Sequence, residues 1–244
     1  MEGGTTTMLL GVKSTREVVL RHLLVGGLAG LAVYGGWEAN GEWDREMRLW
    51  KSFGVGAAAL IWFVALVGPA ARLWPALTRL VSWRREAGVW FTLVVLGHFA
   101  LVWDGWARWS VRELLGFQYV PELDAYLRFE PGFGLANLMG LLALLFALVL
   151  AATSFDRAVS FLGISSWKWL HTFSYVVFYT MALHTLYFAF MHYTPSPYRV
   201  MMGLPTAYPE NILRFAYVVM VLSVMGAQAA AFVKTVRQRR AVGR

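Results

Sequence analysis

Three histidines lie inside long apolar segments of the chain. His171 and His184 fall in the apolar run from Trp167 to His192, and His98 falls in an earlier run that begins near Gly88. An ionisable side chain inside a membrane-spanning segment is costly and usually marks a functional site. Imidazole is the commonest metal ligand in proteins and an axial ligand of haem iron. These histidines are therefore candidate ligands of metal or haem centres within a membrane.

The spacing of the histidines limits how many centres they can serve. His171 and His184 are 13 residues apart, which is about 20 Å along a helix and about 140° around it, so they cannot share one metal ion. His98 and His184 are expected at similar depths on two helices that run in the same direction. We expect these two to share a centre, whereas His171 serves a differently oriented centre or lies on a locally distorted helix.

Each membrane histidine also has a simpler interpretation. Polar side chains in helix bundles often form hydrogen bonds to hydroxyl or carbonyl groups of neighbouring helices. The matched depth of His98 and His184 favours the ligand interpretation for this pair. His22 and His192 stand at the two ends of their apolar segments, where we expect interfacial side chains.

The composition is that of an integral membrane protein. Hydrophobic residues make up 58% of the chain, charged residues 15%, and the mean hydropathy is +0.53. The absence of cysteine excludes thiolate-held iron–sulfur clusters, disulfides and cysteine nucleophiles. Six apolar runs predict an all-α six-helix transmembrane bundle that forms a single domain over residues 1–244. The predicted spans are residues 18–37, 52–71, 88–106, 134–153, 169–191 and 212–233.

Basic residues gather at one set of connections between these spans. They are Lys13 and Arg16; Arg72, Arg79, Arg84 and Arg85; Arg157 and Lys168; and Lys234, Arg237, Arg239, Arg240 and Arg244. The positive-inside rule places these connections in the cytoplasm, so both termini are expected there and the chain in the cytoplasmic (inner) membrane. The same flanks account for the net charge of +8 without a nucleic-acid partner, since they also match anionic lipid. The first span lacks a convincing cleavage site, so we expect it to be retained.

Two connections on the opposite, outer side are longer than plain turns. Residues 107–133 interleave aromatic and aliphatic side chains with charged ones, a pattern that predicts a short amphipathic helix in the outer interface. Residues 193–211 contain four prolines, Pro195, Pro197, Pro205 and Pro209. The two loops either cap the outer face or only connect and anchor the spans.

The residues around the histidines resemble those of a known family. The resemblance rests on Ala152-Thr153-Ser154, Leu162-Gly163, Trp167-Lys168-Trp169-Leu170-His171, Tyr175 and His184, and upstream on Arg84-Arg85, Gly88 and His98. Together they resemble the ferric-reductase-like transmembrane domain superfamily, most closely the haem-binding membrane subunit of the bacterial periplasmic methionine sulfoxide reductase system. The likeness covers roughly residues 84–187.

The resemblance implies haem b between the third and fifth spans, with His98 and His184 as its axial ligands. Other members place two histidines on each of these spans, but here Arg84 occupies the position expected for the second histidine of the third span. A second haem at His171 would need an open coordination position, a non-histidine ligand or His22. Arg84 and Arg85 are candidates to bind haem propionates or flavin phosphate, although positive-inside anchoring also explains them.

The resemblance also implies an electron-transfer subunit of an oxidoreductase rather than a complete enzyme. Electrons would come from a quinol or from a cytoplasmic flavin reductase, with FMN or quinone as a further cofactor. They would pass to an extracytoplasmic partner reductase of the molybdenum-containing kind. The alternatives are a stand-alone ferric or cupric metalloreductase and a haem-free structural subunit of a larger membrane complex. Few acidic residues lie inside the predicted spans, which disfavours a proton-coupled transporter.

Overall fold

A computed structural model of the chain describes residues 15–128, 130–193, 200, 203 and 208–242. Six helical segments in it are long and apolar enough to cross a membrane. They are α1 (Thr15–Ala39), α2 (Arg45–Leu73), α4 (Arg84–Gly105), α6 (Pro131–Ala152), the pair α8 (Ile164–His171) and α9 (Ser174–Phe190), and α11 (Arg214–Val242). Each predicted span overlaps one of these segments over nearly its whole length, which confirms a multi-pass helical membrane protein. Lys13, Arg244, Pro195, Pro197 and Pro205 lie outside the described residues.

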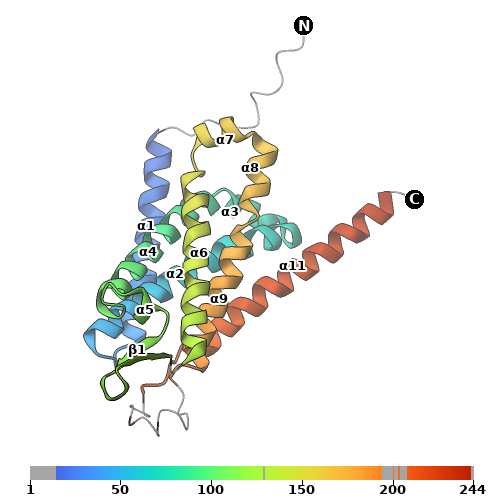
Figure 1. Cartoon of the computed structure of the whole chain (residues 1–244). Helices are drawn as coiled ribbons and strands as arrows, with labels where there is room; N and C mark the ends of the chain where they lie inside the picture. Colours follow the sequence, from blue (N-terminus) through green and yellow to red (C-terminus); the bar gives the residue numbers. More distant parts are fainter. Residues whose placement is uncertain (1–14, 129, 194–199, 201–202, 204–207, 243–244) are drawn as a thin grey trace.

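The six segments alternate in direction, so α1 begins and α11 ends on the same end of the bundle (Figure 1). Short elements join the spans at this end, namely η1 (Pro75–Leu77), α3 (Thr78–Val81) and α7 (Asp156–Leu162). The N-terminus of α2, at the other end, is capped by Asp44, whose carboxylate accepts a hydrogen bond of 2.9 Å from the Met47 amide.

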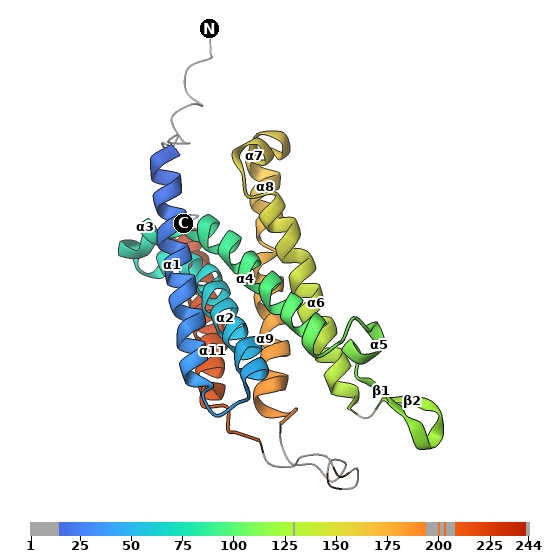
Figure 2. The same cartoon turned by 90° about the vertical axis from the view of Figure 1, so that its left-hand side faces the viewer.

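Helix α2 is the centre of the packing and contacts α1, α4, α9 and α11. Small residues let α1 and α2 approach closely: a Cβ atom on Gly36 would lie 2.8 Å from Val55 Cβ, and one on Gly56 would lie 2.5 Å from Val33 Cγ2. Such small residues are typical of helix contacts within membranes. Helix α6 packs on α9 and on α4, so α2, α4, α6 and α9 surround the middle of the bundle (Figure 2).

The fifth span is interrupted directly after His171. At the interruption the Thr172 and Phe173 amides donate to carbonyls three residues back, Trp169 O and Leu170 O, at 3.0 and 3.1 Å. The Thr172 hydroxyl also donates to Trp169 O at 2.6 Å, and such back-bonding by serine and threonine bends helices. The sequence leaves open whether His171 serves a differently oriented centre or lies on a locally distorted helix. The structure shows that the helix is distorted directly after His171.

The connection after α4 lies at the end of the bundle opposite the start of α1; we call this end outer, and the other end inner, after the predicted orientation. This connection contains less helix than the predicted interfacial segment. Its helical part, α5 (Val111–Leu114), is only one turn long, and an antiparallel hairpin follows, with strands β1 (Phe117–Val120) and β2 (Ala125–Arg128) joined by η2 (Pro121–Leu123). Tyr119 and Tyr126 face each other across the strands with ring centroids 5.3 Å apart. Aromatic cross-strand pairs stabilise hairpins, so the bundle carries a small β element that an all-α prediction leaves out.

Candidate functional site

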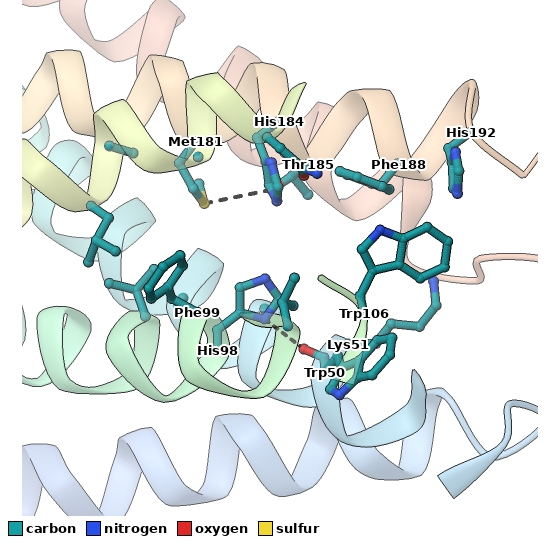
Figure 3. A pocket seen from close by; sticks show the side chains of 18 of the residues that line it. Trp50, Lys51, His98, Phe99, Trp106, Met181, His184, Thr185, Phe188 and His192 are labelled. Atoms are coloured by element: carbon teal, nitrogen blue, oxygen red, sulfur yellow. Dashed lines mark hydrogen bonds between the residues drawn. The ribbon is translucent and has the colours of Figure 1, made fainter. Parts of the chain in front are cut away.

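A cavity of about 180 Å³ lies between α2, α4, α6 and α9. Most of its wall is apolar, with contributions from Val95, Phe99, Leu144 and Phe188. An apolar cavity of about 150 Å³ already admits benzene, so the enclosed part of this one is about the size of one aromatic ring. Two of its polar side chains are the imidazoles of His98 and His184 (Figure 3).

His98 and His184 face each other across this cavity from α4 and α9 (Figure 3). The ring of His98 has its Nδ1 atom 2.9 Å from the carbonyl oxygen of Trp50 on α2, and that of His184 has Nδ1 2.8 Å from the carbonyl oxygen of Ala136 on α6. Because a carbonyl only accepts, each Nδ1 is the donor, and each neutral ring carries its free lone pair on Nε2. Metal-ligating histidines are usually held in this way.

The distance between the two rings fits a single metal ion between them. An imidazole nitrogen lies about 2.0–2.1 Å from a metal ion such as zinc, and about 1.1 Å from its own ring centre when ring bonds are about 1.33 Å long. Two imidazoles on opposite sides of one ion therefore place their centroids about 6.2–6.4 Å apart. The centroids of His98 and His184 are 6.4 Å apart, and the ring planes are nearly perpendicular at 84°.

A glycine stands behind each histidine, four residues after the carbonyl that holds it. Gly54 follows Trp50 on α2, and Gly140 follows Ala136 on α6. On a helix the Cβ atom of residue i+4 leans back over residue i, so a glycine there leaves the carbonyl open to a donor from another helix. A Cβ atom on Gly140 would lie only 3.0 Å from His184 Nδ1, whereas one on Gly54 would lie 3.6 Å from His98 Cε1.

Polar and aromatic residues gather at the outer end of the cavity. Lys51 lies there beside Trp106 and His192 (Figure 3). His192, expected at the interface, is only 8% exposed and places Nδ1 2.7 Å from Glu130 Oε2. Lys51 and the two glycines are site residues that the sequence did not single out. The glycines had a readable signal, since each lies in an apolar span without a turn to explain it.

His171 does not line this cavity. It lies at the end of α8, with its ring against Trp167 at a centroid distance of 4.1 Å and Nε2 3.2 Å from Thr153 Oγ1. The Thr153 hydroxyl hydrogen is directed to the Val149 carbonyl at 2.9 Å, so His171 Nε2 donates its own hydrogen to Thr153. Its Nε2 atom is therefore engaged, in contrast to those of His98 and His184.

Arg84 and Arg85 also lie away from the cavity, at the inner end of α4. Arg85 binds the Ser154 carbonyl and pairs with Asp156 at 2.6 Å, which ties α4 to the connection after α6. Arg84 points inward and donates to Ser174 Oγ at 3.4 Å, while its buried Nε–H has no hydrogen-bond partner among the described residues.

His22 lies on α1, which is not packed against the helix that carries His171. Helix α1 packs on α2 and α4, and both views place it apart from α8 (Figures 1 and 2). Arg21, the residue before His22, pairs with buried Glu86 at 3.5 Å and donates to the Ser82 carbonyl at 3.0 Å. Within the described part of the chain, no group of three or more histidine or acidic side chains could hold a metal ion. Of the predicted ligand residues, the fold brings His98 and His184 together.

No protein-family model, curated protein or solved structure matches the sequence. The function therefore has to be argued from the site.

Proposed function

We propose that this chain is a membrane haem b electron-transfer subunit with one haem held between His98 and His184. The observation that carries the proposal is the pair of imidazoles 6.4 Å apart, each tethered through Nδ1 to a backbone carbonyl. Haem b held by these two imidazoles would supply one-electron transfer rather than oxygen binding.

The residues of the cavity have distinct tasks in this function. The carbonyls of Trp50 and Ala136 fix the tautomer of each histidine and raise the basicity of its Nε2 atom. Val95, Phe99 and Leu144 form an apolar wall that excludes water, and burial of this kind is one of the factors that set a haem potential. Gly140 allows the ring of His184 to lie against α6.

One haem fits the chain better than two. His171 Nε2 is engaged by Thr153, and the residue at the matching depth on α4 is Arg84, which is not a haem ligand. A second haem at His171 would require both side chains to rearrange. We therefore assign Arg84, whose buried Nε–H lacks a partner, to binding an oxygen of the electron donor at the inner end, a quinone or FMN.

The direction of transfer follows from the proposed orientation. With the basic connections in the cytoplasm, both termini lie inside and the chain belongs to the cytoplasmic membrane. The haem cavity then lies toward the outer face, with Leu114 of α5 in its wall. Electrons from a quinol or a cytoplasmic flavin reductase would leave there for an extracytoplasmic partner reductase, for which the sequence resemblance favours a molybdenum-containing enzyme.

The test is the haem content of the purified protein and of three variants, His98→Ala, His184→Ala and His171→Ala. We expect one haem per polypeptide in the parent and in His171→Ala, and loss of haem in the other two. The reduced-minus-oxidised spectrum of the parent should be that of a single haem b centre.

Each contrary result points to a different function. A parent that takes up no haem, even with ample supply during expression, would leave the haem-free structural subunit as the better proposal. A haem-loaded parent that reduces ferric or cupric chelates without any partner would favour the metalloreductase. Two haems, one of them lost in His171→Ala, would establish an inner centre.

A further inference from the structure

Lys51 places an ammonium group at the outer end of the cavity among aromatic rings. Its Nζ atom lies 4.0 Å from the ring centroid of Trp43 and 4.5 Å from that of Tyr193. The side chain is partly buried and lines the same cavity as His98 and His184. Contacts with aromatic faces stabilise such a cation, but they do not neutralise its charge.

The part of the chain that the structure describes supplies no anion for this ammonium group. Among the described residues, no carboxylate lies within ion-pair distance of Lys51 and no oxygen accepts a hydrogen bond from it. The residues of the nearby connection that the structure leaves undescribed, 194–199, 201–202 and 204–207, include no Asp or Glu. Glu130, at this end of the cavity, pairs with His192. A charge withdrawn from water without a partner is costly, so the complementary anion is expected to come with the ligand.

The cavity has an apolar end and a polar end. Met181 and Phe99 lie toward one end in Figure 3, and Lys51 and His192 lie toward the other. Asn40 also lines the wall and is held by its own bond of 2.7 Å to the Gly36 carbonyl. Such a cavity fits a ligand with a large apolar body and an anionic edge. Haem b is such a molecule, because its ring is apolar and its two propionates are carboxylates.

We infer that Lys51 binds a propionate carboxylate of the haem at the outer end of the cavity. The inference rests on the proposed haem site and names a binding residue for it. A lysine and a carboxylate form a charge-assisted hydrogen bond, which is about twice as strong as a neutral one. Lys51 thereby orients the haem with its charged edge toward the outer face, and the imidazoles of His98 and His184 fix its iron.

The experiment measures the rate of haem loss from the loaded full-length protein to excess apomyoglobin in detergent. Lys51→Met removes the charge and keeps the apolar stem, Lys51→Arg keeps the charge, and Arg239→Met removes a charge from an exposed position near the end of α11. Each protein is loaded with haem b or with its dimethyl ester, whose propionates carry no charge. The four combinations of parent or Lys51→Met protein with acid or ester haem form a double-perturbation cycle.

With haem b, we expect Lys51→Met to lose haem at least about tenfold faster than the parent, since hydrogen bonds to charged groups contribute this much or more. The rates of haem loss from Lys51→Arg and Arg239→Met should stay within about twofold of the parent rate. With the dimethyl ester, the parent itself should lose haem faster than it loses haem b. The Lys51→Met substitution should then raise the rate of loss by no more than about twofold.

The outcomes separate this inference from the proposed function. Haem bound through His98 and His184, but lost equally fast from the parent and Lys51→Met, would overturn the inference and leave the function standing. Equal acceleration for haem b and its ester would also overturn it, because Lys51 would then serve packing or a lipid phosphate. If Lys51→Met fails to fold, equal loss of the acid and ester haems from the parent overturns the inference on its own. A parent without haem would instead refute the proposed function.

Discussion

Gly140 offers the sharpest test of the site, because it separates close packing behind His184 from helix stability. In Gly140→Ala the new Cβ atom would lie 3.0 Å from His184 Nδ1 and 3.2 Å from Cε1. Contacts of this length require the imidazole to shift by a few tenths of an ångström. The shift lengthens the 2.8 Å hydrogen bond to the Ala136 carbonyl, which fixes the position of Nε2.

The expected magnitude follows from the loss of this hydrogen bond. Removing an outer partner of a metal-ligating histidine typically weakens metal binding about 10–100-fold, so Gly140→Ala should bind haem that much more weakly. Gly54→Ala should change the affinity little, because its Cβ atom would lie at an ordinary contact distance of 3.6 Å from His98 Cε1. Gly226→Ala on α11 is the matched control, since nothing lies within 4 Å of its new Cβ atom. Glycine-to-alanine changes inside helices stabilise them by about 0.5–1 kcal/mol, so all three variants should fold.

The assay is haem content and the rate of haem transfer to apomyoglobin, measured side by side for the three variants. We expect a ranking, with Gly140→Ala clearly the weakest binder and the other two close to the parent. Retention of haem by Gly140→Ala at the level of Gly226→Ala would show that the observed position of His184 is not the ligating one. Equal weakening in all three variants would show a general effect of the substitution instead.

Three further predictions concern the rest of the molecule. Deleting the imidazole in His171→Phe should leave the haem spectrum and midpoint potential of the single centre unchanged, because that ring does not line the cavity; a shifted potential would contradict this. Arg21→Met should lower the free energy of unfolding in detergent by about 1 kcal/mol or more, since it removes one partner of Glu86, which is 2% exposed, and adding Glu86→Leu should restore much of it; no recovery in the double variant would refute the pairing argument. Because the chain lacks cysteine, Glu122→Cys and Arg239→Cys report orientation cleanly: an impermeant maleimide should label only the former in intact spheroplasts, and the reverse pattern would invert the topology.

The six spans and the histidine pair could be predicted because both depend on distances along a helix. An apolar run near twenty residues must cross the bilayer, and the rise per residue fixes the depth of His98 and His184 within their spans. The contact between them follows once α4 and α9 pack around the same space. The sequence does not distinguish a distorted helix from two orientations for His171, because the break depends on how the Thr172 hydroxyl bonds in the folded chain.

The hairpin at the outer end was missed for a different reason. Residues 117–128 contain three aromatic residues and one β-branched residue around a Pro-Glu-Leu-Asp stretch, which is a readable hairpin signal. Because the rest of the chain has a membrane composition, the alternating pattern favoured an interfacial helix. The structure contains only the single helical turn α5 there. Lys51 was missed because a lysine near the start of a span is ordinary by the rules of membrane topology, and only its cage of Trp43 and Tyr193 sets it apart.

His98 and His184 are held by the same kind of contact, although they lie on different helices. In each half of the site a histidine on one helix donates to the carbonyl of a residue on a neighbouring helix, and a glycine follows that residue by four positions. At Gly140 a Cβ atom would crowd the histidine ring, whereas at Gly54 it would not. A histidine that served only to join helices would need the hydrogen bond, but it would not need its second nitrogen turned toward an apolar space. Both rings lie across the same cavity with their centroids 6.4 Å apart, and this arrangement is why we propose a ligand shared by the two Nε2 atoms rather than interhelical packing alone.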